Sequence, residues 1–534
     1  MSRSLLALTL LLGGLISVSN GETPRPNIIF IMADDLGIGD VSCYGGPQNR
    51  IPTPHLDRLA REGVRFTDAH TVASICVPSR IAIMTGRYPW RFQPPQPSGP
   101  WGFLNPQFDS EQYTLGKMMK QAGYQTGYIG KWHLGTEMVT TDGNNQGPEN
   151  VDYTASLKWG PQDLGFDHSF ILPGSLDMFP YAFVENHQWV GEVTAQKGWS
   201  AFHRVGPAAQ DFEDDQVLDH FCQQAEQFVQ HSVTRNPDQP FFLYLALTSP
   251  HTPVSPSAAF QGQSPVGIYG DFVIETDHCI GRILKRLDQL NLTDNTLILA
   301  TSDHGPASYA GPIAKATPSQ VHLMEREGHF PNGIYRGYKF SAYEGGLRIP
   351  LLARWPGKVP AGKTCDRLVG LQDLMATLAE VIEVELTPIQ APDSISFLSL
   401  LHAPDVDSQR EQMILRSAQA FVIRDHQWKL ILDPGSGCPG KHGNRPTAAD
   451  AWERAVTDFG RTPQRQDLTS APFVQLFDLE NDPQESNNLA GAYPDRVQKL
   501  VGHLEASIER GRSTPGPTLR NDRANIPYLP RQPR

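Results

Sequence analysis

Short and almost uninterrupted apolar runs recur along this chain, and they constrain its fold more than any other feature. The first covers residues 27–33, and later ones cover residues 241–247 and 296–300. A continuous apolar run of this length suits a strand that is buried on both faces of a parallel sheet. Helical patterns at residues 213–230 and 267–290 lie between these runs. The alternation predicts an α/β fold with a large, mainly parallel sheet and helices on both of its faces.

The last third of the chain has a different pattern. Residues 386–410 are rich in Pro, Asp and Ser, which is typical of a domain boundary. Beyond them we expect antiparallel strands at 412–423, 427–432 and 476–479, and a closing helix at 495–510. The sequence therefore predicts a large domain over residues 22–395 and a small C-terminal α+β subdomain over residues 396–534. Its Pro- and Arg-rich end after Gly511 is expected to be loosely held.

The first residues have the pattern of a secretory signal peptide. Arg3 precedes an apolar run over residues 5–18, which is too short to span a bilayer comfortably, and small residues follow it up to Gly21. We therefore predict a signal peptide over residues 1–21 and a periplasmic or secreted protein, with an uncleaved anchor as the alternative. The later sequence shows no transmembrane stretch, so no stable membrane span is expected. A net charge of -12 also argues against nucleic acid as a partner.

Polar residues cluster just past the predicted C-terminal ends of several strands. Ligands bind at that edge in open α/β sheets, so the clusters together predict one convergent site. Any one of them alone would be interpreted as a helix cap or as a polar group that solvates a loop. The clusters are Asp34 with Asp35, Lys131 with His133 after a short predicted strand at residues 125–129, His251 in Ser-Pro-His-Thr-Pro, and Asp303 with His304.

The aspartates of these clusters favour a metal site. Asp34, Asp35 and Asp303 offer hard oxygen donors, which suit Ca2+ or Mg2+. Adjacent aspartates also occur in turns and helix caps, and that reading stays open at this point.

One further stretch has the features of a reactive position. Cys76-Val77-Pro78-Ser79-Arg80 reads as a helix start, with Pro78 suited to the first helical position and Gly86 to the stop. The free N–H groups of a helix N-terminus favour anionic chemistry at Cys76, and Arg80 lies one turn further on. A helix-start cysteine beside an arginine is activated in general terms, whereas a lone cysteine is more often a buried structural thiol.

The whole string resembles the signature of the type I sulfatases. Cys-x-Pro-Ser-Arg at residues 76–80 is followed by Thr-Gly-Arg at residues 85–87, and the resemblance extends over about residues 27–490. It implies the alkaline-phosphatase-like sulfatase fold, with residues 22–395 as the catalytic domain, and points to secreted arylsulfatases and N-acetylgalactosamine-6-sulfatases. In that family a formylglycine-generating or anaerobic sulfatase-maturating enzyme oxidises the cysteine to Cα-formylglycine before folding. The hydrate of its aldehyde is the nucleophile.

The resemblance also implies a role for each matched residue. A divalent metal, usually Ca2+ with Mg2+ as the alternative, would be held by Asp34, Asp35, residue 76, Asp303 and His304. Most members have Asn where this chain has His304, and a nitrogen donor leaves the metal identity open. The remaining implied roles are sulfate binding by Lys131 and Lys339, stabilisation of the hydrated aldehyde by Arg80, breakdown of the enzyme-bound ester by His133, protonation of the leaving oxygen by His251, and substrate contact by Ser175 and Asp177.

The predicted function is therefore hydrolysis of a sulfate monoester, on a sulfated carbohydrate or an aryl sulfate. A phosphonate or phosphodiester hydrolase of the same superfamily is the near alternative, and a non-catalytic binder of sulfated glycans is the distant one. The chain has six cysteines, so five remain if Cys76 is converted and at least one of these is unpaired. The sequence leaves the pairing of any disulfide open.

Overall fold

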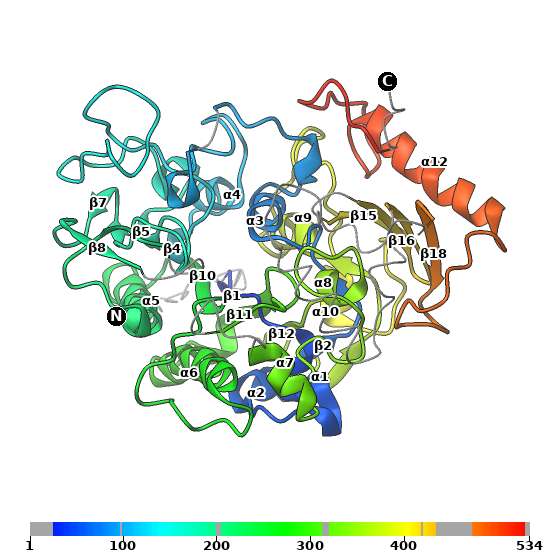
Figure 1. Cartoon of the computed structure of the whole chain (residues 1–534), viewed down its shortest axis with the longest axis horizontal. Coiled ribbons are helices and arrows are strands. Elements are labelled where there is room, and N and C mark those ends of the chain that lie inside the picture. Colours follow the sequence, from blue (N-terminus) through cyan, green and yellow to red (C-terminus); the bar gives the residue numbers. More distant parts are fainter. Residues whose placement is uncertain are drawn as a thin grey trace, which may run out of the picture.

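A ten-stranded sheet runs through the centre of the molecule (Figure 1). The computed structural model describes residues 25–96, 99–198, 204–311, 320–417, 420–433 and 472–528, so the predicted signal peptide lies outside the described residues. The strands are β1 (Asn27–Asp34), β2 (Val64–Phe66), β4 (Gln125–Lys131), β5 (His168–Leu172), β6 (Val184–Glu185), β7 (Gln188–Trp189), β10 (Phe241–Pro250), β11 (Thr296–Ser302), β12 (Leu351–Arg354) and β13 (Lys363–Cys365). Their order in the sheet is β13-β2-β12-β11-β1-β10-β4-β5-β6-β7.

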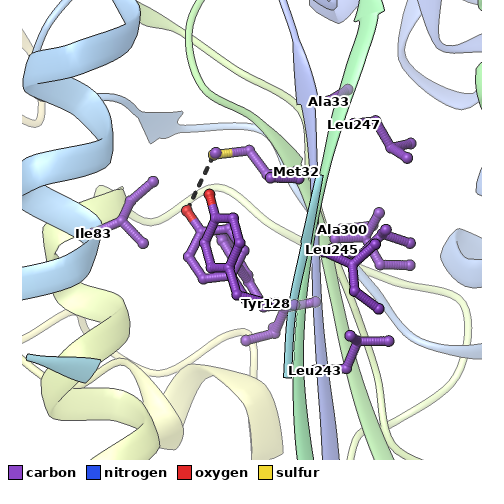
Figure 2. Packing of buried hydrophobic residues seen from close by; sticks show 14 of the residues in the cluster. Met32, Ala33, Ile83, Tyr128, Leu243, Leu245, Leu247 and Ala300 are labelled. Carbon is purple, nitrogen blue, oxygen red and sulfur yellow. Dashed lines mark hydrogen bonds between the residues drawn. The ribbon is translucent and has the colours of Figure 1, made fainter. Parts of the chain in front are cut away.

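The middle of this sheet is parallel, as the apolar runs predict. β11, β1, β10, β4 and β5 follow one another in parallel register. Every residue of β1 and β10 is buried. Side chains alternate between the two faces of a strand, and Figure 2 shows Met32 and Tyr128 on the side of Ile83, with Leu243, Leu245 and Leu247 on the other. The central strands are therefore covered on both faces, which explains their continuous apolar sequences.

Helices supply that cover. α2 (Pro54–Glu62), α5 (Val217–Arg235) and α6 (Ile268–Gln289) lie on one face of the sheet, and α3 (Cys76–Thr85), α4 (Leu115–Gln121) and α9 (Leu374–Val381) on the other (Figure 1). A disulfide between Cys222 and Cys279 joins α5 to α6, which settles a pairing that the sequence left open. The shorter helices are α1 (Ser42–Gly45), α7 (Gln320–Arg326), α8 (Glu344–Leu347) and α10 (Leu398–His402).

The structure corrects several local predictions. Residues 136–210, where little sequence periodicity predicts an irregular stretch, contain β5, a full member of the parallel sheet. β12, which no pattern predicted, adds an antiparallel strand beside β11. Residues 89–110, whose composition suggests a surface loop, bury Trp90 and Phe103. α3 begins at Cys76 itself, so Pro78 is its third residue rather than its first. Proline is tolerated there because the first N–H groups of a helix have no carbonyl partner within it.

A small antiparallel sheet forms the C-terminal part, as predicted. It contains β15 (Gln412–Arg416), β16 (Phe421–Asp425), β17 (Trp428–Leu432) and β18 (Val474–Asp478), and α12 (Pro494–Arg510) packs against β16. The segment 412–423, expected to be one strand, is divided between β15 and β16. Two further sheets pair β3 (Ala69–His70) with β14 (Val369–Gly370), and β8 (Ala195–Lys197) with β9 (Gly206–Ala208). Tyr88 and Trp90 share an apolar core with Trp428 and Leu430, and the boundary at residue 395 stays a prediction.

The described chain after Gly511 is held, which contradicts the expected loose tail. Asn521 accepts a hydrogen bond of 2.8 Å from the buried Arg91, and the Asp522 N–H donates to the carbonyl of the same arginine at 3.1 Å. Asp522 also forms an ion pair with Arg87 at 3.0 Å. The Pro- and Arg-rich composition predicted a loosely held tail, because composition does not show which distant residues the tail contacts. Among the described residues, no helix combines the length and the apolar character that a membrane span needs.

Candidate active site

The register of the central strands brings the polar clusters together. Asp34, the last residue of β1, is paired with Pro250 at the end of β10, and Ala33 is paired with Ser302 at the end of β11. The residues that follow these ends, including Asp35, His251 and Asp303, therefore meet at one edge of the sheet. This is the edge at which open α/β sheets bind ligands.

Four buried side chains form the centre of this edge. The candidate ligand atoms of Asp34, Asp35, Cys76 and His304 all lie within 4.8 Å of one another. The Cys76 sulfur lies 3.2 Å from Nε2 of His304 and 3.6 Å from Oδ1 of Asp34. Nε2 of His304 is also 3.3 Å from Oδ1 of Asp35. The N-terminus of α3 thus places Cys76 directly against two carboxylates and an imidazole.

Asp303 adjoins this group. Its Oδ1 lies 3.6 Å from Nε2 of His304 and accepts a hydrogen bond of 3.2 Å from the Asp35 N–H. Its Oδ2 accepts a hydrogen bond of 3.1 Å from the Arg80 guanidinium. One oxygen of Asp303 therefore faces the centre while the other is held by a cation.

Two lysines complete the ring of charges. Lys131 Nζ lies 2.6 Å from Oδ2 of Asp34 and 3.5 Å from the Cys76 sulfur. Lys339 Nζ lies 2.8 Å from Oδ1 of Asp35. Arg80 was expected beside Cys76, but its hydrogen bonds go to Asp303 and to the Lys131 carbonyl, and its Nε has no hydrogen-bond partner among the described residues.

Two buried groups of the centre have pKa values above their usual range. Burial raises the pKa of Asp303 to about 7, although His304 opposes the shift. Burial lowers the pKa of His304, but Asp303 and its acidic neighbours outweigh that effect and raise it to about 9. Asp34 differs from Asp303, because Lys131 outweighs the effect of burial and lowers the pKa of Asp34 to about 2. Two groups that favour protons beyond their usual range indicate a place suited to a cation.

The orientation of His304 tests whether a metal fits. Its Nδ1 lies 2.9 Å from the Gly305 carbonyl, and since a carbonyl only accepts, Nδ1 carries the proton. When the ring is neutral, as a metal ligand must be, Nε2 presents its lone pair to Asp34, Asp35 and Cys76. A hydrogen bond from the ring nitrogen that does not face the metal is what fixes the tautomer of a ligating histidine. Carboxylate oxygens and one imidazole nitrogen, turned inward and buried, fit a divalent cation.

Two more histidines face the centre. His251 donates from Nδ1 to the Thr252 carbonyl at 2.5 Å, which leaves Nε2 facing Asp35, 3.8 Å from its Oδ2. The backbone N–H of His133 donates to the Pro173 carbonyl at 3.1 Å. The ring Nδ1 of His133 is buried without a hydrogen-bond partner among the described residues. His133 has φ 54°, in the left-handed region, so the turn after β4 determines where its ring lies.

The segment after β5 supplies unpaired polar atoms. Ser175 Oγ and Asp177 Oδ1 are buried and have no hydrogen-bond partner among the described residues. Asp177 Oδ1 lies 4.0 Å from Nδ1 of His251, while its Oδ2 accepts a bond of 2.8 Å from Arg204. The guanidinium carbon of Arg204 lies 3.8 Å from the centroid of the Trp101 ring. Sequence reasoning missed Arg204 and Trp101, because both lie in irregular stretches without a motif.

A second acidic cluster resembles a metal site only at first sight. Asp68, His70 and Glu344 also group their candidate ligand atoms within 4.8 Å. However, Arg424 binds Asp68 at 2.7 Å and contacts His70, and Arg348 binds Asp68 and Glu344. Burial and Arg424 lower the pKa of His70 to about 4. Since arginines already supply positive charge here, the cluster is a structural ion network at the base of the C-terminal sheet.

Comparisons with known proteins identify the family and agree with this fold. Residues 26–384 match the family model described as Sulfatase. The chain is 35% identical over 532 residues to an N-acetylgalactosamine-6-O-sulfatase of Bacteroides thetaiotaomicron, covering 92% of this chain and 95% of that protein. It is 30% identical to the human steryl-sulfatase, covering 95% and 91%. A solved structure from work on glycosaminoglycan metabolism by Bacteroides thetaiotaomicron superposes with a TM-score of 0.74 at 32% identity, covering 91% and 99%.

The chain therefore belongs to the sulfatase family, and the recognition made from the Cys76 string is confirmed. It is a sulfatase enzyme, which hydrolyses sulfate esters, so the alternative of a non-catalytic binder is set aside.

Proposed function

We propose that this sulfatase removes the sulfate group from a sulfated carbohydrate, and that N-acetylgalactosamine 6-sulfate is the first unit to test. The observation that carries the proposal is the position of Cys76 between the acidic centre and the Lys131 ammonium, 3.5 Å from the sulfur. The choice of sugar is supported by the 35% identical relative, whose name specifies N-acetylgalactosamine. Activity on phosphonate or phosphodiester substrates, the near alternative within the superfamily, is tested in the same panel.

Sulfate binding is assigned to the cations of the centre. Lys131 and Lys339 bind Asp34 and Asp35 in the free protein and would turn one N–H each toward the sulfate oxygens. A Ca2+ or Mg2+ ion would be held by Asp34, Asp35, Asp303 and His304 together with residue 76. When bound, it supplies positive charge that polarises the sulfate ester.

The nucleophile is assigned to residue 76. We propose that Cys76 is converted to formylglycine by a maturation enzyme, so that the sulfur marks where a hydrate oxygen stands. Burial would raise the pKa of the Cys76 thiol, but Lys131 and Lys339 hold it well below its usual value. The same positive potential stabilises an anionic oxygen at this position. Arg80 keeps Asp303 and the Lys131 backbone in place beside it.

Proton transfers are assigned to the two histidines. His251 is proposed to protonate the leaving oxygen, because its Nε2 faces the centre while Nδ1 is held by Thr252. His133 is proposed to accept the proton when the enzyme-bound ester breaks down, since its buried Nδ1 has no hydrogen-bond partner among the described residues. Ser175 and Asp177 are proposed to contact the sugar, because each offers a buried polar atom that lacks a partner in the described structure.

The test is sulfate release from a panel of defined esters by protein whose Cys76 conversion has been confirmed. N-acetylgalactosamine 6-sulfate, its 4-sulfate isomer, 4-nitrophenyl sulfate and a phosphonate ester separate the alternatives, and Cys76→Ala is the control. Turnover of the 6-sulfate above the other esters supports the proposal. Preferred turnover of the phosphonate would replace it with the superfamily alternative, and turnover of aryl sulfate alone would reject the sugar. N-terminal sequencing of secreted protein tests the signal peptide at residues 1–21.

A further inference from the structure

The backbone carbonyl of Lys131 is hydrogen-bonded to the side chains of two other residues. Lys131 is the last residue of β4, and the pairing of β4 with β10 ends one residue earlier, at Gly130 and Ala246. Gly130 has φ 120°, and a Cβ there would meet the Ala246 oxygen at 1.8 Å, so only glycine allows this turn of the strand. The Lys131 carbonyl then accepts two hydrogen bonds, from Arg80 at 2.9 Å and from the Tyr128 hydroxyl at 2.7 Å.

Tyr128 is held rigidly in the core. It is fully buried, and its ring centroid lies 4.8 Å from that of Trp132, 5.2 Å from Phe166 and 4.7 Å from Tyr244. Figure 2 shows Tyr128 beside the sheet on the side of Ile83, which belongs to the Cys76 helix. Because the ring is packed on several sides, the hydroxyl has a fixed position from which it can align the carbonyl.

We infer that Tyr128 is a positioning residue of this sulfatase, acting through the Lys131 backbone and Arg80. The Tyr128 hydroxyl, the Lys131 carbonyl, Arg80 and Asp303 form a continuous chain of hydrogen bonds beneath the site. Without the hydroxyl, the Lys131 carbonyl loses one of its two side-chain donors, at the point where β4 is paired only with β5. The inference rests on the proposed function, because it assumes that Lys131 and Arg80 serve the reaction.

The experiment compares two tyrosines of equal size and burial. Tyr128→Phe keeps the ring and removes the hydroxyl that supports Lys131. Tyr244→Phe is the matched control, because its hydroxyl contacts only the Met32 sulfur, at 3.7 Å, among its described hydrogen bonds. On 4-nitrophenyl sulfate and the preferred sugar sulfate, Tyr128→Phe should lose about 5- to 30-fold in kcat, the effect of one buried hydrogen bond that orients a charged group. Tyr244→Phe should stay within about 2-fold of the parent enzyme.

A coupling measurement separates positioning from general destabilisation. Arg80→Lys replaces the guanidinium that donates to the same carbonyl with a single ammonium, so its effect and that of Tyr128→Phe should be less than multiplicative in the double variant. Melting temperature and formylglycine content, by mass spectrometry, should be the same for the two phenylalanine variants. Full activity of Tyr128→Phe, losses equal to those of Tyr244→Phe, or multiplicative effects with Arg80→Lys would each overturn the inference.

The same series distinguishes a failure of the inference from a failure of the proposed function. If Lys131→Ala and Arg80→Lys both retain activity, the site assignment itself is wrong. If these two variants lose activity while Tyr128→Phe does not, only the positioning role is rejected.

Discussion

Replacing His251 with alanine tests the assignment of the proton donor, because the structure makes a prediction that depends on the leaving group. The Nδ1–H bond of 2.5 Å to the Thr252 carbonyl fixes the ring, and its buried Nε2 is the atom turned toward the centre. A sugar alkoxide is a poor leaving group and needs a proton as the ester bond breaks. A nitrophenolate is stable as an anion and needs little help.

The expected magnitude follows from this difference. General acid catalysis contributes about 10²- to 10⁴-fold, or about 2.7–5.4 kcal/mol of transition-state stabilisation. His251→Ala should therefore lose a factor in that range on a sugar sulfate and about 10-fold or less on 4-nitrophenyl sulfate. Asp177, 4.0 Å from Nδ1, is too far for a hydrogen bond and should not compensate for the missing ring.

The assay is kcat/KM for both substrates, with metal content and formylglycine occupancy measured on the same preparation. His251→Gln serves as the companion variant, because it restores polar volume without an acidic proton. Equal losses on the two substrates would refute the reasoning and assign His251 to sulfate binding. A Gln variant as active as the parent on the sugar sulfate would refute it as well.

The other predictions concern residue 76, the metal site and a remote carboxyl group. The tryptic peptide 66–80 of active protein should have the mass of formylglycine at residue 76, and Cys76→Ala should fold without turnover. Active protein with only the thiol would contradict this. Chelation should abolish activity and lower the melting temperature, since metal at 100 times its Kd stabilises by about 2.7 kcal/mol; full activity in metal-stripped protein, verified by elemental analysis, would disprove it. His304→Asn exchanges a nitrogen donor for an oxygen donor, so the ratio of reactivation of stripped protein by Ca2+ to that by Zn2+, which imidazole favours, should rise; an unchanged ratio would exclude His304 as a ligand. Burial raises the pKa of Glu275 to about 7, so the folded protein binds that proton more tightly and loses stability as the pH rises from about 4.5 to 7. Between pH 5 and pH 8 the free energy of unfolding should therefore fall by up to about 3 kcal/mol more in the parent than in Glu275→Gln, as measured by denaturant unfolding. The same pH dependence of this free energy in both proteins would reject the prediction.

The sequence predicted those parts of the fold that depend on local pattern. The apolar runs located β1, β10 and β11 because a strand buried on both faces needs apolar side chains at every position. It did not locate β5 or β12, which have five and four residues. Short strands of this kind are stabilised by pairing with distant segments, and the pattern within the strand does not show that partner.

A similar limit applies to the site. The residues predicted at strand ends lie at one edge, because the C-terminal ends of parallel strands share an edge regardless of the loops that follow. Arg204 and Trp101 were missed because they are brought beside Asp177 only by a contact of 3.8 Å between two irregular segments. Tyr128 was missed for a different reason. A tyrosine within a buried strand is expected from packing alone, so its sequence position gave no sign of a contact with the site. Only the bond of its hydroxyl to Lys131 distinguishes it from its neighbour Tyr244.

The ion pairs of the centre explain why substrate binding should depend on the metal. Lys131 pairs with Asp34, Lys339 with Asp35 and Arg80 with Asp303, so three cations and three carboxylates cancel before any ligand arrives. A sulfate monoester carries one negative charge and gains little from a site of zero net charge in a chain of charge -12. A divalent ion among the same carboxylates would make the site positive and weaken the hold of Asp34 and Asp35 on their lysines. The lysines would then be free to meet the sulfate oxygens, so metal loading should control substrate affinity as well as the rate of the chemical step.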